Sequence, residues 1–139
     1  MIVFDTDVLT AILLGNPALV ERAAAIPVRE QAVPVIVIEE IMRGRLNVIR
    51  QAEAGRANVN IAHAYELFEE TFTDFRRIQV LSYTSQADAL YQQWRQQGIR
   101  IATHDLRIAA TCVAHAGILI SRNRLDFERV PGLRVEFWE

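Results

Sequence analysis

The sequence contains no lysine, so all fifteen basic residues are arginines. This absence excludes any mechanism that needs a lysine, including phosphate loops that end in Gly-Lys-Ser or Gly-Lys-Thr. A single cysteine, Cys112, excludes an internal disulfide and fits a reducing compartment. No run of eighteen apolar residues is present, so we expect no membrane-spanning segment. The opening MIVFDTD lacks the basic region of a signal peptide, and we therefore expect a cytoplasmic protein.

The chain also lacks a strong excess of charge of either sign. Seventeen acidic and fifteen basic residues give a formal net charge of −2, so net charge alone suggests no nucleic-acid partner. What the chain does have is an apolar content of 51%, which is enough for a hydrophobic core. Its 139 residues suit one domain over positions 1–139.

Short apolar segments alternate with helical patterns along the chain. Strands are expected at residues 2–4, 32–35, 78–81, 118–120 and 133–137. Helices are expected from Asp5 or Thr6 to about Leu14, from Asn16-Pro17 to Pro27, along the stripe Val37–Val48, from Ile61 to Phe75, from Thr84 or Ser85 to Gly98, and from Asp105 to Ala116.

This alternation indicates an α/β fold, a three-layer α/β/α arrangement whose short sheet is mostly parallel. Pro34 makes the second strand short or places it at an edge of the sheet. Because no strand pattern lies between Val37 and Arg77, these helices should protrude as an antiparallel hairpin.

Acidic residues lie where strands end and helices begin. Asp5 follows the first strand, Glu40 lies within about the first turn of its helix, and Asp105 opens another helix. Ligands of open α/β sheets bind at the carboxyl ends of strands. Each Asp taken singly is most often a helix cap. Two carboxylates about 4 Å apart, however, repel by roughly 4 kcal/mol at an effective dielectric of 20, so a cluster persists when a cation holds it. Oxygen ligands favour Mg²⁺ or Mn²⁺ over zinc.

The adjacent Glu39 and Glu40 cannot both face this edge of the sheet. The apolar stripe Val37–Val48 borders Glu40 and favours it as the ligand. A competing stripe through Ile38 and Met42 would favour Glu39.

Four segments in order resemble the PIN-domain ribonucleases, and within them the VapC-type toxins: VFDTDVLT, EEIMRG, IATHDLRIAA and ILISRNRLDFERVPGLRVEFW. The resemblance implies a Mg²⁺- or Mn²⁺-dependent endoribonuclease with Asp5, Glu40 and Asp105 as its catalytic metal ligands. The family's fourth acidic position is taken by Asn123, a neutral ligand. Asp126 either substitutes for it as a metal ligand or caps the following turn.

Such a metal site predicts hydrolysis of RNA by an activated water, without a histidine base. Thr6 and Ser121 lie beside the acids and would orient water or phosphate, or serve as local caps. Arg43 and Arg122 would grip phosphates. We expect a cluster of arginines near the same edge, although each alone is more often part of a solvated or ion-paired surface: Arg43, Arg45, Arg50, Arg122 and Arg124. The histidines show no facing carboxylate or cysteine pattern and are expected to be structural or surface residues: His63, His104 and His115.

The resemblance also implies a homodimer that is silenced by a small antitoxin protein. An apolar groove around Tyr65, Phe68, Phe72 and Phe75 would accept a partner helix, but a place in the core is favoured for most of these side chains. Two alternatives stay open. The Asn at position 123 is compatible with a PIN-like module that binds RNA or protein without cutting. The stretch DTDVLT also resembles the nucleophile motif of haloacid-dehalogenase phosphatases, but no late acidic pair supports it.

Overall fold

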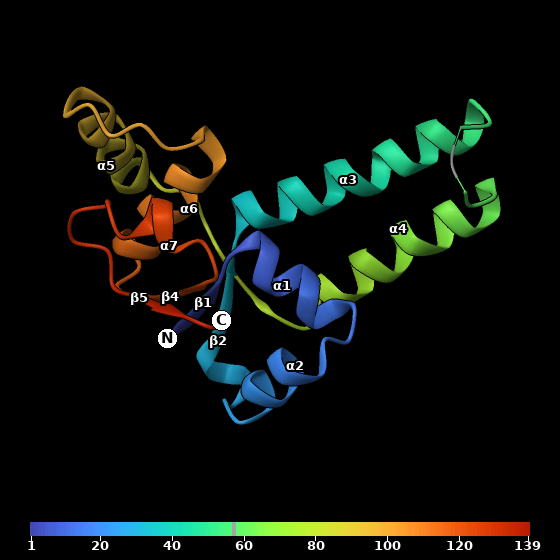
Figure 1. The fold of residues 1–139 in the computed structure, drawn as a ribbon, viewed down its shortest axis with the longest axis horizontal. Coiled ribbons are helices and arrows are strands. Elements are labelled where there is room, and N and C mark those ends of the chain that lie inside the picture. The colour runs from blue at the N-terminus through green and yellow to red at the C-terminus, as the bar shows by residue number, and fades with distance from the viewer. Residues whose placement is uncertain (57) are drawn as a thin grey trace.

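The computed structural model describes residues 1–56 and 58–139. Its strands and helices follow one another in the order β1 (Ile2–Phe4), α1 (Thr6–Leu13), α2 (Pro17–Ala24), the 3-10 turn η1 (Val28–Glu30), β2 (Gln31–Pro34), α3 (Val35–Glu53), α4 (Ile61–Phe75), β3 (Gln79–Leu81), α5 (Ser85–Gln96), α6 (Thr103–Ala114), β4 (Ile118–Ser121), α7 (Arg124–Phe127) and β5 (Val135–Phe137). The predicted α/β class is confirmed (Figure 1).

Within the described residues the strands form one five-stranded sheet in the order β3-β2-β1-β4-β5. Every pairing is parallel, with Val3 of β1 opposite Ala32 on one side and Leu119 on the other. Of the two alternatives for Pro34, the short strand is confirmed, since β2 has only four residues, and the edge position is wrong, because β2 lies between β1 and β3. Pro34 is tolerated there because it is the last residue of its strand and the N-cap of α3.

Helices cover both faces of the sheet, with α1 and α2 on one side and α5 and α6 on the other (Figure 1). The chain moves outward from β1 through β2 to β3, and then returns to the other side of β1 as β4. Right-handed crossovers place the connecting helices on opposite faces before and after this reversal. The reversal leaves a crevice at the carboxyl ends of β1 and β4, where parallel sheets of this kind bind ligands.

The predicted antiparallel hairpin is confirmed and consists of α3 and α4, which project from the body (Figure 1). Ile36 and Val37 are buried near the base of α3, and Phe75 is buried at the end of α4 that returns to the body. The predicted break between the two helices includes Ala57, which lies outside the described residues.

Two predicted helix positions differ from the structure. Helix α6 begins at Thr103 rather than at Asp105, so Asp105 lies inside the first turn and not at the N-cap. Glu40 is the sixth residue of α3 and therefore lies in its second turn rather than its first. Of the helices that the structure describes, none has the length and apolar character needed to cross a bilayer.

Candidate functional site

Asp5 stands at the carboxyl end of β1, where it is also the N-cap of α1. Its Oδ1 accepts a hydrogen bond from the backbone N–H of Val8 at 2.8 Å, and the residue is only 4% exposed. Burial raises the pKa of Asp5, because a desolvated carboxylate is less stable in its charged form. Hydrogen bonds from the Ser121 side chain and the Val8 backbone act against this shift. Asp5 therefore has both of the roles considered for it: it caps α1, and it places a carboxylate at the carboxyl edge of the sheet.

Glu40 faces α1, whereas Glu39 does not. The hydroxyl of Thr6 donates a hydrogen bond to Glu40 Oε1 at 2.5 Å, which connects α1 to α3. Glu39 is exposed and accepts a hydrogen bond from Arg43 at 2.9 Å. Glu40 therefore faces α1, although Ile38 and Met42 of the competing stripe pack against the core as Ile41 does, and the choice of Glu40 as a metal ligand stays a prediction.

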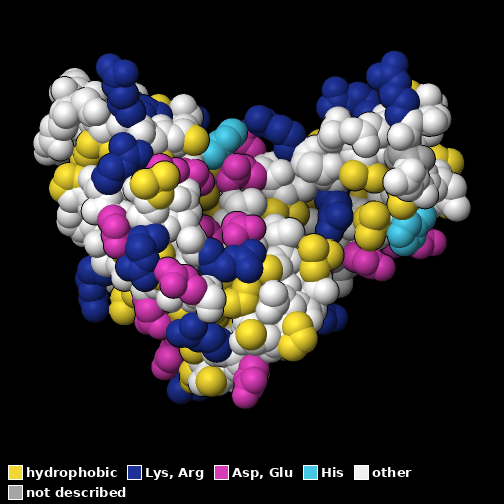
Figure 2. All heavy atoms as spheres, in the orientation of Figure 1, with side chains coloured by type: hydrophobic (Ala, Val, Ile, Leu, Met, Phe, Trp, Pro, Cys, Tyr) yellow, Lys and Arg dark blue, Asp and Glu magenta, His cyan; other side chains and the backbone are white. Residues whose placement is uncertain are grey.

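Asp105, in the first turn of α6, lies near enough to Asp5 and Glu40 for their charges to affect it. Its pKa is raised from 3.8 to about 6, first by burial and then by repulsion from Glu40, Asp5 and Asp126. The nearby His104 acts in the opposite direction. Three acids from other elements are thus close enough to disfavour the charge of Asp105. Acidic side chains gather beside the hollow between the body and the hairpin (Figure 2).

A pocket of about 440 Å³ opens in this region, and it is lined by Asp5, Thr6, Asp7, Thr10, Asp105, Asn123 and Phe127. Asn123 reaches it from the loop after β4 and is the N-cap of α7. Its Nδ2 donates to Asp126 Oδ2 at 2.9 Å, and its Oδ1 accepts from the backbone N–H of Asp126 at 3.2 Å. Asp126 also pairs with Arg129 at 3.0 Å. Asn123 therefore lines the pocket, while the carboxylate of Asp126 beside it is paired with Asn123 and Arg129.

His104 faces two carboxylates, although no pattern in the sequence indicated this. Its Nε2 lies 3.2 Å from Glu39 Oε1, and its Nδ1 lies 3.9 Å from Glu40 Oε2. His63 also faces an acid, Glu66, but on the exposed surface of α4. The sequence signal for His104 was its position next to Asp105 in the first turn of α6. The contact between α6 and α3 that brings it to the glutamates has no local signal.

The donor set of this site fits a hard divalent cation by its chemistry. Asp5, Glu40, Asp105 and Asn123 offer only oxygen atoms as metal ligands. Burial at Asp5 and both burial and repulsion at Asp105 disfavour the charged carboxylates, and a cation bound by these acids would offset that cost. Among the described residues, however, no three His, Cys, Asp or Glu side chains form a ready-made metal site.

Most arginines of the predicted cluster are already paired or lie elsewhere. Arg43 pairs with Glu39 at 2.9 Å, and Arg122 pairs with Asp7 at 2.9 Å. The expectation that all five lie near the acids is wrong for Arg50, which is ten residues beyond Glu40 and thus about 15 Å further along α3. The other two have different partners: Arg45 donates to Thr71, and Arg124 pairs with Glu128 and Glu139.

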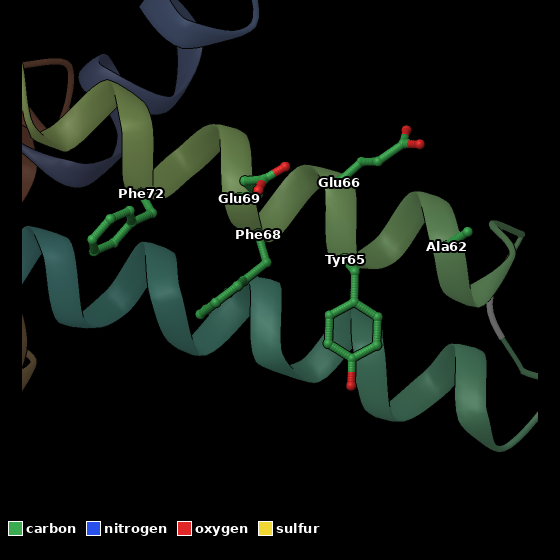
Figure 3. Close-up of a pocket in the computed structure, with 6 residues that line it drawn as sticks. All are labelled: Ala62, Tyr65, Glu66, Phe68, Glu69 and Phe72. Atoms are coloured by element: carbon green, nitrogen blue, oxygen red, sulfur yellow. The ribbon is translucent and has the colours of Figure 1, made fainter.

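A second hollow, of about 380 Å³, lies on α4 of the hairpin. Tyr65, Phe68 and Phe72 point from α4 toward the side of α3, while Glu66 and Glu69 point away (Figure 3). The preference for a core position is wrong for Tyr65 and Phe72, which are 52% and 54% exposed. It is correct for Phe75. Amphipathic periodicity reveals an apolar stripe but not whether another part of the chain covers it.

Comparison with known proteins gives consistent matches. The model of the PIN domain family matches residues 2–133. Ribonuclease VapC1 of Rickettsia felis is 33% identical over 100 residues, which cover 72% of this chain and 70% of the relative. Ribonuclease VapC of Rickettsia bellii is 27% identical over 134 residues, covering 96% and 93%. The crystal structure of VapBC2 from Rickettsia felis, bound to a promoter DNA fragment, contains a chain with a TM-score of 0.75 at 19% identity, and both chains are covered completely. This last likeness concerns the fold.

Proposed function

Because the chain belongs to the PIN domain family, we propose that it is a metal-dependent endoribonuclease, the toxin of a VapBC-like toxin–antitoxin pair acting in the cytoplasm. Relatives named as VapC ribonucleases support the nuclease activity. The observation that carries the proposal is the geometry of the site: Asp5 and Asp105 line one pocket, and Thr6 of the same pocket donates a hydrogen bond to Glu40 of α3. That site lies beside the crevice at β1 and β4.

Asp5, Glu40 and Asp105 would hold the ion, Mg²⁺ or Mn²⁺, with Asn123 or Asp126 as the fourth ligand. When bound, such an ion polarises the phosphodiester and lowers the pKa of the attacking water. The carboxylates themselves are held in place by hydroxyl groups. Thr6 donates to Glu40, and Ser121 forms a hydrogen bond with Asp5. We infer that these two hydroxyls orient the acids as well as any water or phosphate.

Arg43 and Arg122 would bind the RNA backbone at the rim of the site. Both guanidinium groups are paired with exposed acids, Glu39 and Asp7 respectively. Exposed ion pairs of this kind contribute only about 0–1 kcal/mol, so exchanging a carboxylate for a phosphate costs little. A bidentate contact with phosphate would then favour the RNA complex.

The partner would be an antitoxin protein that docks on the hairpin of a homodimeric toxin. The solved structures similar to this fold include VapBC complexes, which supports a protein partner. The hollow formed by Tyr65, Phe68 and Phe72 suits the apolar face of an amphipathic helix (Figure 3). Glu66 and Glu69 beside it favour a helix with basic flanking residues.

The test is cleavage of total RNA with Mg²⁺ or Mn²⁺ by the wild type and by Asp5→Asn, Glu40→Gln and Asp105→Asn. We expect cleavage by the wild type only. Glu53→Gln, at the far end of α3, is the matched control and should cleave normally. Equal RNA decay with wild type and site variants would indicate a contaminating nuclease and refute the proposal.

The alternative, a PIN-like module that binds without cutting, rests on Asn123 and needs its own test. Asn123→Asp restores the acid of the family pattern. An inactive wild type together with an active Asn123→Asp variant would favour the binding module. An active wild type excludes it.

A further inference from the structure

Gly44 lies in the middle of α3 without a structural reason for being glycine. A Cβ atom built on Gly44 meets nothing within 4 Å among the described residues. Its backbone is ordinary helix, and it is not among the glycines with a positive φ. Glycine in a helix interior is destabilising relative to alanine. Gly44 therefore lowers the stability of α3, and closer packing within the protein does not compensate for this loss.

The bare backbone of Gly44 instead lines a pocket of about 300 Å³ between α1 and α3. The other lining residues are Thr6, Thr10, Leu14, Glu40, Ile41 and Arg45. Thr6 and Thr10 also line the pocket that holds Asp5 and Asp105, called the acidic pocket from here on, so the two pockets lie next to each other and share these two threonines as a common wall. Gly44 comes four residues after Glu40 and so lies on the same face of α3, one turn further along.

Arg45 is the positively charged residue among those that line this pocket, and a hydrogen bond to α4 holds its side chain in place. Its Nε donates to Thr71 Oγ1 at 2.9 Å, and the buried Thr71 in turn donates to the Leu67 carbonyl at 2.8 Å. Unlike Arg43 and Arg122, Arg45 forms no ion pair with any carboxylate of the described part of the chain. The Arg45 guanidinium makes no other hydrogen bond among the described residues, so its remaining N–H groups are available to an anion.

We propose that this pocket binds one nucleotide of the RNA next to the scissile phosphate, an inference that rests on the proposed nuclease function. The base would lie over Gly44 between the apolar side chains of Leu14 and Ile41, and Arg45 would bind the adjoining phosphate. Three observations favour a nucleotide: the pocket adjoins the acidic pocket through Thr6 and Thr10, its cation has no acidic partner among the described residues, and its apolar walls suit a flat base. Gly44 would then determine which base fits.

The first experiment separates occupancy from folding through Gly44. Gly44→Ala should raise the Tm by about 2–4 °C, since alanine is the better helix former. Gly44→Leu, which fills the pocket, should lower the affinity for a labelled single-stranded RNA by at least about tenfold. Affinity is measured in the Asp105→Asn background, so that no cleavage intervenes. Gln51→Leu is the matched control on α3 and should bind RNA as the parent does.

Arg45 is tested in the same way. Arg45→Gln should weaken RNA binding about tenfold or more, because a charge-assisted hydrogen bond to phosphate is lost. Arg50→Gln removes the same charge from α3 outside the pocket and should have a much smaller effect. In the cleavage-competent protein, Gly44→Ala should also change the base preference next to the cut bond, which a purely structural role would not do.

Each outcome is decisive. Unchanged RNA affinity and base preference in Gly44→Leu would overturn the nucleotide subsite and leave the nuclease proposal intact. A variant that binds and cuts RNA normally but loses the antitoxin would assign the pocket to the protein partner, which also overturns the inference. A wild type that binds RNA through Gly44 and Arg45 but never cuts it would refute the nuclease proposal and the placement beside a scissile phosphate, while the nucleotide site itself would stand.

Discussion

Asp105→Asn should stabilise the metal-free protein while abolishing cleavage. The pKa of Asp105 is raised from 3.8 to about 6, so the folded state disfavours the charged form. A shift of this size corresponds to roughly 3 kcal/mol at neutral pH. Because the side chain is only partly buried, we discount this to about 1–3 kcal/mol. Asparagine carries no charge. Among the described residues nothing forms a hydrogen bond with the Asp105 side chain, so the substitution breaks no such bond.

The assay is thermal unfolding in EDTA, followed by circular dichroism. At pH 7.5 the variant should melt about 3–10 °C above the wild type. A folded-state pKa above the unfolded value means that the wild type loses stability as the pH rises from 3.8 through about 6. The advantage of the variant should therefore shrink as the pH falls through 6 and vanish below about 4. Added Mn²⁺ should raise the Tm of the wild type more than that of the variant.

Glu53→Gln removes a charge of the same sign from the exposed end of α3 and should leave the Tm within about 1 °C at every pH. The reasoning is refuted if Asp105→Asn melts at or below the wild-type temperature at pH 7.5. It is equally refuted if the gain persists unchanged at pH 4, since the acids would then not be responsible for it.

Three further predictions concern other parts of the molecule. Thr6→Val removes the hydrogen bond to Glu40 and should lower kcat/KM about tenfold while unfolding by urea shows a loss of only about 1 kcal/mol; a normal kcat/KM would show that Glu40 needs no such support. Phe72→Ser should weaken binding of a cognate antitoxin in titration calorimetry with little change in Tm, whereas Leu125→Ser, which alters a still more exposed apolar side chain on α7, should not; equal effects would exclude the hairpin groove as the docking site. Burial raises the pKa of Cys112 to about 12, so the thiol should react with an aromatic disulfide reagent only as fast as the protein unfolds, and rapid labelling of the native protein would contradict its burial.

Much of the fold could be predicted because its signals are local. Apolar runs such as Ile2–Phe4 and Ile118–Ile120 have the length of buried parallel strands, and the caps Asn16 and Thr84 mark helix starts that the structure reproduces. The position of Asp5 follows from the same logic, because a residue directly after a central strand must lie at the carboxyl edge of the sheet.

The remaining features depend on contacts between elements distant in the sequence. His104 meets Glu39 only because α6 packs against α3, and Arg122 meets Asp7 only because β4 lies beside β1. Neither pairing has a periodicity or a motif. The exposure of Tyr65 and Phe72 could not be predicted either, because the hairpin projects from the body and, within the described part of the chain, no third element covers the flank of α3 and α4 to which they point.

The double engagement of Asp5 has an evolutionary consequence. Its carboxylate holds the first turn of α1 as well as facing the acidic pocket, so a chain that loses this acid also loses part of its scaffold. Asp105 has no such duty, and its removal relieves repulsion. Among descendants selected for harmlessness, substitutions should therefore accumulate at position 105 sooner than at position 5. Inactive descendants of this protein would then have a higher free energy of unfolding than the active ancestor.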